Sequence, residues 1–370
     1  MIRIQKVVLH HLSLKLKTPF ESSLETVTDR ESIIVEAEDQ RGVVGYGEVV
    51  AFSSPWYTEE TIQTCYHLLK DFLIPLVFGN SFEHPSEVQK VFKRLKRNQM
   101  AKSAIEGAIW DIYAKKQETS LALQLGGSRK EIDAGVVVGI SNQKTMLNQI
   151  ETYLADGYKR IKIKIKPSQD LSIVREIRKH FPNLPLMADA NSSYKLTDIN
   201  RLKELDQYNL LMIEQPLAAD DIVDHRLLQS QIETPICLDE SIVTFEDAKK
   251  AIELGSCKVI NIKPGRVGGL TESIKIHDYC MDHAIPVWVG GMLESGVSRA
   301  HNIALASLEN FSIPGDLSAS TRYWEEDIIL PEVEVRNGKI KVPIDMPGIG
   351  FGLNEQAIKK FTTKIDQFNK

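Results

Sequence analysis

The sequence has few cysteines, and those it has are not grouped. Cys65, Cys237, Cys257 and Cys280 are scattered over 370 residues, and no C-x-x-C pair occurs. This scatter excludes the ligand spacing of a zinc finger or a redox motif, and a chain of this length does not need a disulfide framework. We therefore expect reduced thiols and a cytoplasmic protein.

Long apolar runs and an excess of positive charge are also missing. No stretch of eighteen apolar residues occurs, and the N-terminal residues lack the continuous apolar core of a signal peptide. Lys and Arg number 45 against 50 Asp and Glu, which gives a formal net charge of −5. Electrostatic binding to nucleic acid requires a basic surface. We therefore expect neither a nucleic-acid partner nor a membrane.

The pattern of apolar residues changes at Gly126–Gly127. Residues 1–60 alternate as strands do, and the segments that follow have the spacing of helices, so residues 1–127 are predicted to form an α+β domain. Between residues 128 and 320, eight short apolar runs alternate with helix-length segments. This repeat favours an α/β fold, a parallel (β/α) barrel, over an open doubly wound sheet. Residues 321–370, with a hairpin turn at Asn337–Gly338, are expected to return to the first domain.

Five of the predicted barrel strands end on a charged residue, and these residues lie 24 or 25 positions apart along the chain. They are Lys164, Asp189, Glu214, Asp239 and Lys263. Active sites of such barrels lie at the C-terminal ends of the strands, so equal phase places all five around one rim. Capping of a helix could explain each acid taken alone. It does not explain the two lysines, or the order of the charges along the chain, which is one lysine, three acids and one lysine.

Three carboxylates on neighbouring strands repel one another unless their pKa values rise or a cation neutralises them. Oxygen ligands with no Cys or His nearby suit Mg²⁺, with Mn²⁺ as a substitute. We therefore predict that Asp189, Glu214 and Asp239 bind a divalent metal. A cation and a second ammonium disfavour the charged form of each flanking lysine, so that one can be neutral near pH 7 and accept a proton.

The segment RIKIKIKPSQ at residues 160–169 alternates lysine with isoleucine. Taken alone, it is more typical of an exposed amphipathic strand than of a catalytic one. In a barrel strand, however, the isoleucines face the helices and the lysines face the lumen. We expect Lys164 to be catalytic, Lys162 to be its electrostatic neighbour, and Lys166 to reach the rim or solvent.

The motifs K-I-K (162–164), ADAN (188–191), IEQP (213–216), LDES (238–241) and NIKPGRVGG (261–269) resemble the enolase superfamily and its muconate-lactonizing subgroup. The resemblance implies a modified (β/α)7β barrel of TIM type with an N-terminal capping domain. It also implies a carboxylate substrate bound to Mg²⁺, and Lys164 and Lys263 moving the proton alpha to that carboxylate through an enediolate. Asn191 and Glu240 are then candidates for orienting the ligands and lysines, and Arg266 for tuning Lys263.

Within that subgroup, GGMLESG and IPGDLSASTRYWEEDI most resemble the o-succinylbenzoate synthases of menaquinone biosynthesis that share N-succinylamino-acid racemase activity. Strand seven lacks the His of the mandelate-racemase branch. Ser318 stands where dipeptide epimerases carry the second Asp of an Asp-x-Asp, which weakens that reading. Val137 replaces a small polar residue of the family on strand one. Whether the synthase or the racemase activity is the biological one stays open.

The substrate contacts are expected from two loops of the first domain and from the ends of the last two barrel strands. The first loops are TPFESS (18–23) and AFSSPWYTEE (51–60), which offer an apolar roof that excludes water. The candidate residues are Pro19, Phe20, Phe52, Trp56, Met292 and Ser318. We also expect a homo-oligomer. The alternatives are a dipeptide epimerase or muconate cycloisomerase of the same subgroup, or a barrel that binds metal without catalysis.

Overall fold

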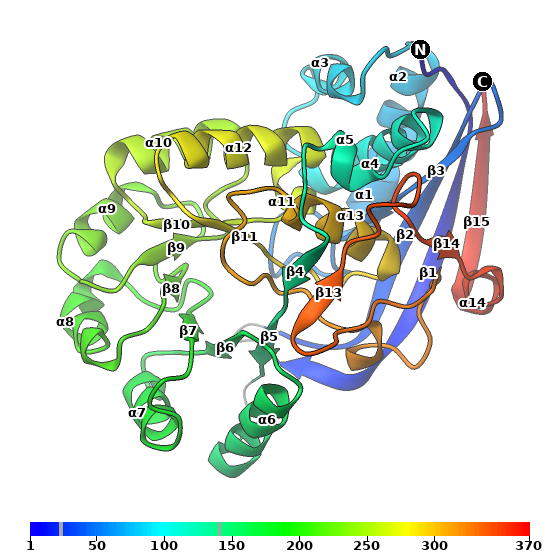
Figure 1. The fold of residues 1–370 in the computed structure, drawn as a ribbon. Helices are drawn as coiled ribbons and strands as arrows, with labels where there is room; N and C mark the ends of the chain where they lie inside the picture. The colour runs from blue at the N-terminus through cyan, green and yellow to red at the C-terminus, as the bar shows by residue number, and fades with distance from the viewer. Residues whose placement is uncertain (22–24, 140–141) are drawn as a thin grey trace.

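The structure, a computed structural model, describes residues 1–21, 25–139 and 142–370. One part is an antiparallel sheet in the order β15-β1-β2-β3, and the other is a ring of parallel strands wrapped by helices (Figure 1). The last two residues of the TPFESS motif lie outside the described part of the chain.

The antiparallel sheet is built from three strands at the start of the chain and one at its end. These are β1 (Ile4–Glu21), β2 (Thr26–Asp39), β3 (Val44–Val49) and β15 (Thr362–Asn369). Helix α4 (Gln99–Lys116) packs on β2 and β3. A Cβ atom on Gly47 would lie 1.8 Å from the carbonyl oxygen of Ala104, so only glycine allows this close packing of helix on strand. Helix α4 also contacts the barrel through α11 (Pro264–Val267).

The parallel sheet follows the order of the chain, with each strand paired to the next. Its strands are β5 (Gly135–Val138), β6 (Arg160–Lys164), β7 (Leu186–Asp189), β8 (Ile213–Glu214), β9 (Ile236–Leu238), β10 (Val259–Ile262) and β11 (Val287–Val289). Helices alternate with them: α6 (Gln143–Ala155), α7 (Asp170–His180), α8 (Ile199–Lys203), α9 (Val223–Gln229), α10 (Phe245–Leu254), α12 (Leu270–Asp282) and α13 (Gly296–Ala306). The predicted barrel is therefore confirmed.

The eighth predicted strand is an irregular segment that closes the ring. The backbone N–H of Asp316 donates to Val289 of β11, and the N–H of Gly135 of β5 donates to Gly315. Pro314 interrupts this segment and has no N–H for a ladder, which explains why it forms bridges without a full strand.

The tail after the barrel pairs with both parts of the molecule. Strand β13 (Lys339–Lys341) pairs with β4 (Glu131–Asp133), and β15 pairs with β1. Asn337 and Gly338 have φ values of 53° and 72°, as a two-residue hairpin turn requires. The remaining elements are α1 (Ile62–Leu68), α2 (Ile74–Phe78), α3 (Val88–Phe92), α5 (Leu121–Gln124), β12 (Ile329–Leu330), β14 (Gly352–Leu353) and α14 (Glu355–Phe361). The domain limits at 127 and 320 stay a prediction.

The alternation of β6 sorts its side chains as expected. Ile161 and Ile163 join the apolar core outside the strands, whereas the Lys162 ammonium lies inside the ring, 4.9 Å from the centre of the Trp288 side chain. Below it, the ring interior is filled by a separate apolar cluster of Met187, Met212, Cys237, Val259 and Trp288. The site is therefore bounded below by apolar side chains.

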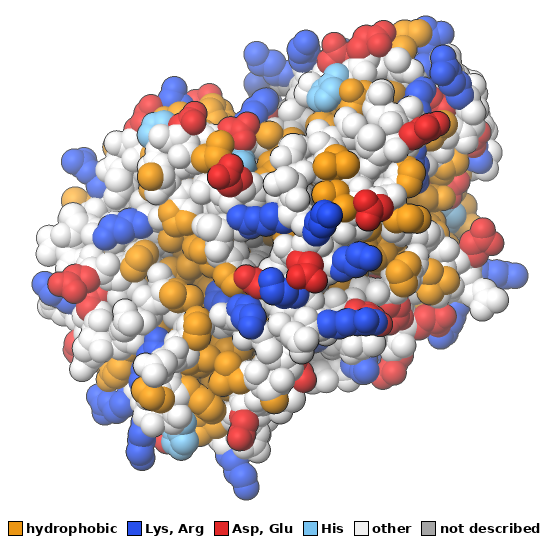
Figure 2. Space-filling model, in the orientation of Figure 1, with side chains coloured by type: hydrophobic (Ala, Val, Ile, Leu, Met, Phe, Trp, Pro, Cys, Tyr) orange, Lys and Arg blue, Asp and Glu red, His pale blue; other side chains and the backbone are white. Residues whose placement is uncertain are grey.

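Two observations concern the exterior and the thiols. Charged side chains of both signs are interspersed over the face shown in Figure 2. In the described part of the chain, no helix has the length and apolar character needed to cross a membrane. All four cysteines are buried and free of disulfides.

Candidate active site

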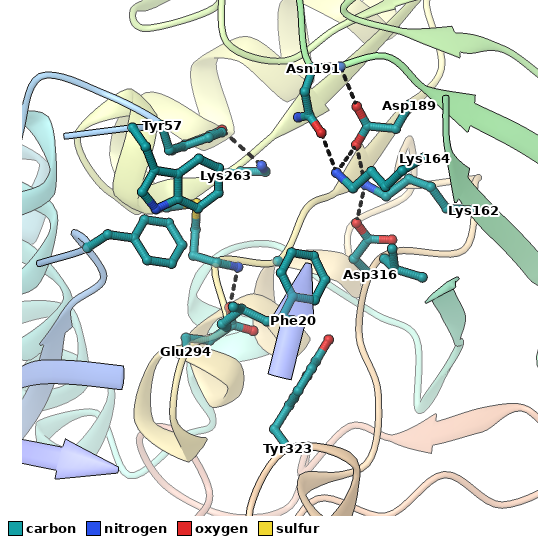
Figure 3. Close-up of a pocket in the computed structure, with 16 residues that line it drawn as sticks. Phe20, Tyr57, Lys162, Lys164, Asp189, Asn191, Lys263, Glu294, Asp316 and Tyr323 are labelled. Atoms are coloured by element: carbon teal, nitrogen blue, oxygen red, sulfur yellow. Dashed lines mark hydrogen bonds and ion pairs between the residues drawn. The ribbon is translucent and has the colours of Figure 1, made fainter. Parts of the chain in front are cut away.

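Lys164 and Asp189 form one wall of a cavity at the C-terminal ends of the barrel strands (Figure 3). They are register partners on β6 and β7, and the Lys164 ammonium lies 2.7 Å from Asp189 Oδ2. It also donates to Asn191 Oδ1 at 2.6 Å. The Asn191 amide N–H donates to Asp189 Oδ1, and its Nδ2 donates to Glu240. Asn191 thus connects the lysine, the carboxylate and Glu240, as expected for an orienting residue.

Lys162 lies deeper in the ring and contacts three carboxylates. Its ammonium is 2.6 Å from Asp316, 3.0 Å from Glu214 and 3.3 Å from Asp189. Burial opposes the charge of Lys162, but the attraction of these acids outweighs it and raises the pKa of the lysine. The Lys162 ammonium therefore lies between the acids, and its role as an electrostatic neighbour of Lys164 stays a prediction.

Glu214 and Asp189 are register partners on β8 and β7, so that their charges repel. Burial, and next the charge of Asp189, raise the pKa of Glu214. Burial also works to raise the pKa of Asp189, but Lys164 and Lys162 outweigh it and hold the pKa below the ordinary value. Two acids that the sequence places on neighbouring strands are therefore also neighbours in space.

Asp239 and Lys263 form the opposite wall. The Lys263 ammonium lies 2.9 Å from Asp239 Oδ2, and Arg266 also pairs with the Asp239 carboxylate. Lys263 follows β10 and reaches the cavity beside Gly290, where a Cβ atom would lie 2.5 Å from the Lys263 Cε. Glycine at the end of β11 thus leaves the path of this lysine open.

Tyr57 comes from the first domain and contacts the same group. Its hydroxyl donates to Asp239 at 3.1 Å and accepts from Lys263 at 2.8 Å. Burial raises the pKa of this phenol. Sequence reasoning selected the neighbouring Trp56 and missed Tyr57, because a loop residue carries no periodic signal.

Without a cation in the site, the surroundings of Lys263 act against the lowered pKa that the sequence predicts. Burial works to lower the pKa of Lys263, but Tyr57, Glu214 and Glu240 attract the ammonium and raise the pKa above its ordinary value. The expected neutral lysine depends on a cation that competes for these carboxylates. A lowered pKa therefore stays a prediction for the metal-bound enzyme.

The three predicted metal ligands offer carboxylate oxygens, which suit Mg²⁺. Among the residues that the structure describes, no three His, Cys, Asp or Glu side chains are arranged as a ready-made metal site. Asp189, Glu214 and Asp239 are instead paired with lysines and Arg266. Buried Glu240 Oε2 has no hydrogen-bond partner among the described residues, and burial and Asp189 raise the pKa of Glu240 to about 6. This unpaired carboxylate oxygen and the oxygen ligands fit a divalent cation.

The cavity between these walls has a volume of about 60 Å³ and an apolar roof. Phe20, Phe52 and Trp56 line it from the first domain, as the sequence predicts, and Met292 lines it from the loop after β11. The rings of Phe52 and Trp56 are 4.6 Å apart. The roof therefore covers the lysines with aromatic side chains, as exclusion of water requires.

Other predicted residues lie outside the lining of this cavity. Ser318 is buried behind it, Glu214, Asp239 and Glu240 lie beneath its surface, and Pro19 lines a neighbouring cavity. Lys166 lines a separate small pocket. The lining residues that sequence reasoning did not assign are Tyr57, Val137, Gly291, Leu293, Glu294, Asp316 and Tyr323. Asp316 stands at the end of the eighth apolar run, as the five predicted rim residues stand near the ends of theirs. This shared position is the signal that could have identified it.

Comparison with known proteins agrees with this geometry. Residues 4–126 match the mandelate racemase / muconate lactonizing enzyme N-terminal domain, and residues 145–357 match the enolase C-terminal domain-like family. An o-succinylbenzoate synthase of Bacillus subtilis is 60% identical over the full length of both chains. An N-succinylamino acid racemase of Thermus thermophilus is 42% identical, with 95% of each chain covered.

A solved structure extends the agreement to the backbone. The crystal structure of an enolase-superfamily member from Listeria innocua superposes with a TM-score of 0.97 at 44% identity, over the full length of both chains. The lysines and acids of the rim thus belong to a barrel whose sequence and fold both match one family. This chain is a member of the enolase superfamily, with the N- and C-terminal domains of its mandelate racemase and muconate-lactonizing branch.

Proposed function

We propose that this enzyme abstracts the proton alpha to a substrate carboxylate, acts as an o-succinylbenzoate synthase, and also racemises N-succinylamino acids. The observation that supports this most is the position of Lys164 and Lys263. Both line one cavity, and β6 and β10 are separated by three strands in the ring, so the two amines face each other across it. The names of the similar proteins from Bacillus subtilis and Thermus thermophilus agree with the two activities.

In the proposed mechanism the lysines work from opposite faces of the alpha carbon. For the synthase reaction, Lys164 takes the alpha proton and later gives a proton to the departing hydroxyl, which leaves as water. Lys263 stays protonated and stabilises the developing negative charge. For racemisation, one lysine removes the proton and the other returns one to the opposite face. Because both reactions share the proton abstraction, one pair of amines serves both.

Asp189, Glu214 and Asp239 would hold a divalent cation, Mg²⁺ or Mn²⁺. Such a cation supplies positive charge where the substrate carboxylate gains electron density during proton loss. Asn191 holds Asp189 and Lys164 in position through one hydrogen bond to each. The aromatic roof excludes water, which strengthens every electrostatic interaction within.

The runner-up functions are less well supported. In a dipeptide epimerase, an acid after the last strand would have to remain available for the substrate. Here Asp316 is paired with both Lys162 and Arg160, each at 2.6 Å. A metal-binding barrel without catalysis would have no need for two lysines that face each other across one cavity. Muconate cycloisomerisation stays an alternative that direct assay with muconate tests.

The test is proton exchange in D₂O, followed by ¹H NMR with N-succinyl-phenylalanine, together with turnover of the synthase substrate. We expect alpha-deuteration with Mg²⁺, loss after EDTA treatment, and recovery when Mg²⁺ is restored. Lys164→Ala and Lys263→Ala should each slow racemisation by about 10³-fold. Lys166→Ala, which lies outside the cavity, is the matched control and should keep the wild-type rate.

Absence of both exchange and synthase turnover in the Mg²⁺-loaded wild type would refute the proposal. Wild-type rates in Lys164→Ala would refute the role of that lysine even if the enzyme is active.

A further inference from the structure

A second, larger cavity adjoins the active-site cavity. Its volume is about 900 Å³, and it lies between the end of β1, helix α6 and the segment around residues 319–323. Phe20, Val137 and Tyr323 line both cavities. A substrate held between the two lysines could therefore extend past these three side chains into the larger space.

Among the described residues that line this second cavity, Arg322 is the one with a positively charged side chain. Its guanidinium donates to the Val137 carbonyl oxygen and to the Tyr153 hydroxyl. It lies 5.0 Å and 5.3 Å from the ring centres of Tyr153 and Tyr323. Two aromatic faces and a backbone oxygen thus hold the guanidinium in a fixed orientation.

Arg322 has no carboxylate partner among the residues that the structure describes. Of the four arginines that are fully buried in the described part of the chain, Arg160 pairs with Asp316, Arg266 with Asp239 and Arg299 with Glu294, whereas Arg30 donates to backbone oxygens. The Nε atom of Arg322 is buried and has no hydrogen-bond acceptor within residues 1–21, 25–139 and 142–370. A buried donor on a charged group is costly to leave unsatisfied, so its position next to a substrate cavity indicates a ligand.

A second unsatisfied polar atom lies in the same cavity. Gln149 Oε1, on α6, is buried and finds no hydrogen-bond partner in the part of the chain that the structure describes. The cavity also contains the acids Glu21 and Asp156, but both are exposed. Solvent screens the charges of these two acids, whereas the charge of the half-buried Arg322 is screened less.

We propose that Arg322 binds the distal carboxylate of the substrate's succinyl group. This inference rests on the proposed function. The two kinds of similar protein are named for o-succinylbenzoate and for N-succinylamino acids, and what these compounds share is a succinyl arm that ends in a carboxylate. Such an arm is about as long as two extended residues, roughly 7 Å, which is a reach suited to a neighbouring cavity.

A guanidinium is well matched to this carboxylate because it offers several N–H donors in a planar fork. The reacting carboxylate then lies between the lysines while the distal one lies on Arg322, so the substrate is held at both ends. This arrangement makes Arg322 a specificity-determining residue that does not take part in proton transfer. Analogues without the second carboxylate would leave the guanidinium unpaired and bind less well.

The test compares N-succinyl-phenylalanine with N-acetyl-phenylalanine, which lacks the distal carboxylate, in wild type and Arg322→Gln. We expect Arg322→Gln to lower kcat/KM for the succinyl substrate by about 30-fold, mainly through KM, and to change the acetyl substrate by less than about threefold. Arg322→Lys should restore part of the loss. Asp156→Asn is the matched control from the same cavity and should not weaken the succinyl substrate.

A second measurement does not depend on the fold of the variant. In the wild type, the methyl ester of the distal carboxylate should have a kcat/KM about 30-fold below that of the free acid. An equal loss for both substrates in Arg322→Gln, or no loss for either, would overturn the inference while the proposed function stands. A wild type that exchanges neither substrate and does not turn over the synthase substrate refutes the proposed function itself, and the inference with it.

Discussion

At the scale of single residues, the site is a network of buried acids and cations in which several members have more than one partner. Asp189 contacts Lys162 and Lys164, and Asp239 contacts Lys263. Removal of one member therefore leaves a buried charge without its partner, which costs more than the pair contributes. Conservative replacements that keep shape are the informative ones.

Tyr57 offers such a replacement. Tyr57→Phe removes the hydroxyl that donates to Asp239 and accepts from Lys263, while the ring stays in the roof. We expect kcat/KM for proton exchange to fall by about tenfold, which corresponds to roughly 1.4 kcal/mol for a hydrogen bond to a charged group. The measurement is exchange kinetics in D₂O at saturating Mg²⁺.

Tyr66→Phe is the matched control, because Tyr66 is a tyrosine of the same domain that pairs with Lys364 far from the cavity. An unchanged rate in Tyr57→Phe would show that the hydroxyl only packs against the lysine.

At the scale of elements, buried carboxylates of the first domain hold the ends of barrel helices. Glu106 of α4 accepts from the backbone N–H groups of Leu270 and Thr271, where α12 begins. Glu48 of β3 accepts from the N–H groups of Ser295 and Ser298 at the start of α13, each at 2.8 Å. The helix dipole and the free N–H groups favour a negative charge there. The first domain is thereby fixed to the loop that carries Met292.

Glu48→Gln tests this connection. The change leaves one acceptor where the carboxylate offers two, so we expect destabilisation of about 2 kcal/mol and a Tm lower by a few degrees. Burial raises the pKa of Glu48. The folded state then binds the proton more tightly than the unfolded chain, and stability falls as pH rises from the ordinary carboxyl value through the raised one.

Glutamine does not titrate, so the gap in Tm between wild type and Glu48→Gln should be smaller at pH 7.5 than at pH 5. Thermal unfolding at both pH values measures it, and Glu38→Gln on the neighbouring β2, half-buried beside Lys6, is the control. A gap that widens with pH would contradict the assignment of the raised pKa to this carboxyl.

At the scale of the whole molecule, the barrel and its rim could be predicted because both rest on periodicity. The five rim residues stand at the ends of successive strands: Lys164, Asp189, Glu214, Asp239 and Lys263. Because parallel strands in a barrel all end on the same side, residues at equivalent strand positions lie around one rim. The fold and family expectations are confirmed on that basis.

The site residues that could not be predicted lie on loops and turns, where the sequence has no repeating pattern. Tyr57 reaches the site from a loop of the other domain, and Arg322 from a short turn after the barrel closes. Their positions depend on how the two domains pack, which no local pattern encodes. The eighth strand also differs, because its Pro314 interrupts the ladder that the apolar run suggests.

The sheet of the first domain depends on the end of the chain. Strand β15 pairs with β1 from Lys6 to Leu12, and it covers the outer edge of a sheet whose other edge is β3. Truncation after Phe361 removes this strand and leaves the backbone groups of β1 unpaired. At roughly 1 kcal/mol for each backbone hydrogen bond lost, we expect a large fall in Tm and concentration-dependent association through the open edge.

The rim of the barrel is far from that edge in the fold (Figure 1). The truncated protein should therefore keep the wild-type KM for exchange at temperatures where it stays folded, since β15 supplies no residue of the cavity. Ile365→Ala, which keeps the strand and changes an exposed side chain, is the control and should behave as wild type. A truncated chain with unchanged Tm would mean that β1 is held by β2 alone, and the end of the chain would then have no part in the stability of the first domain.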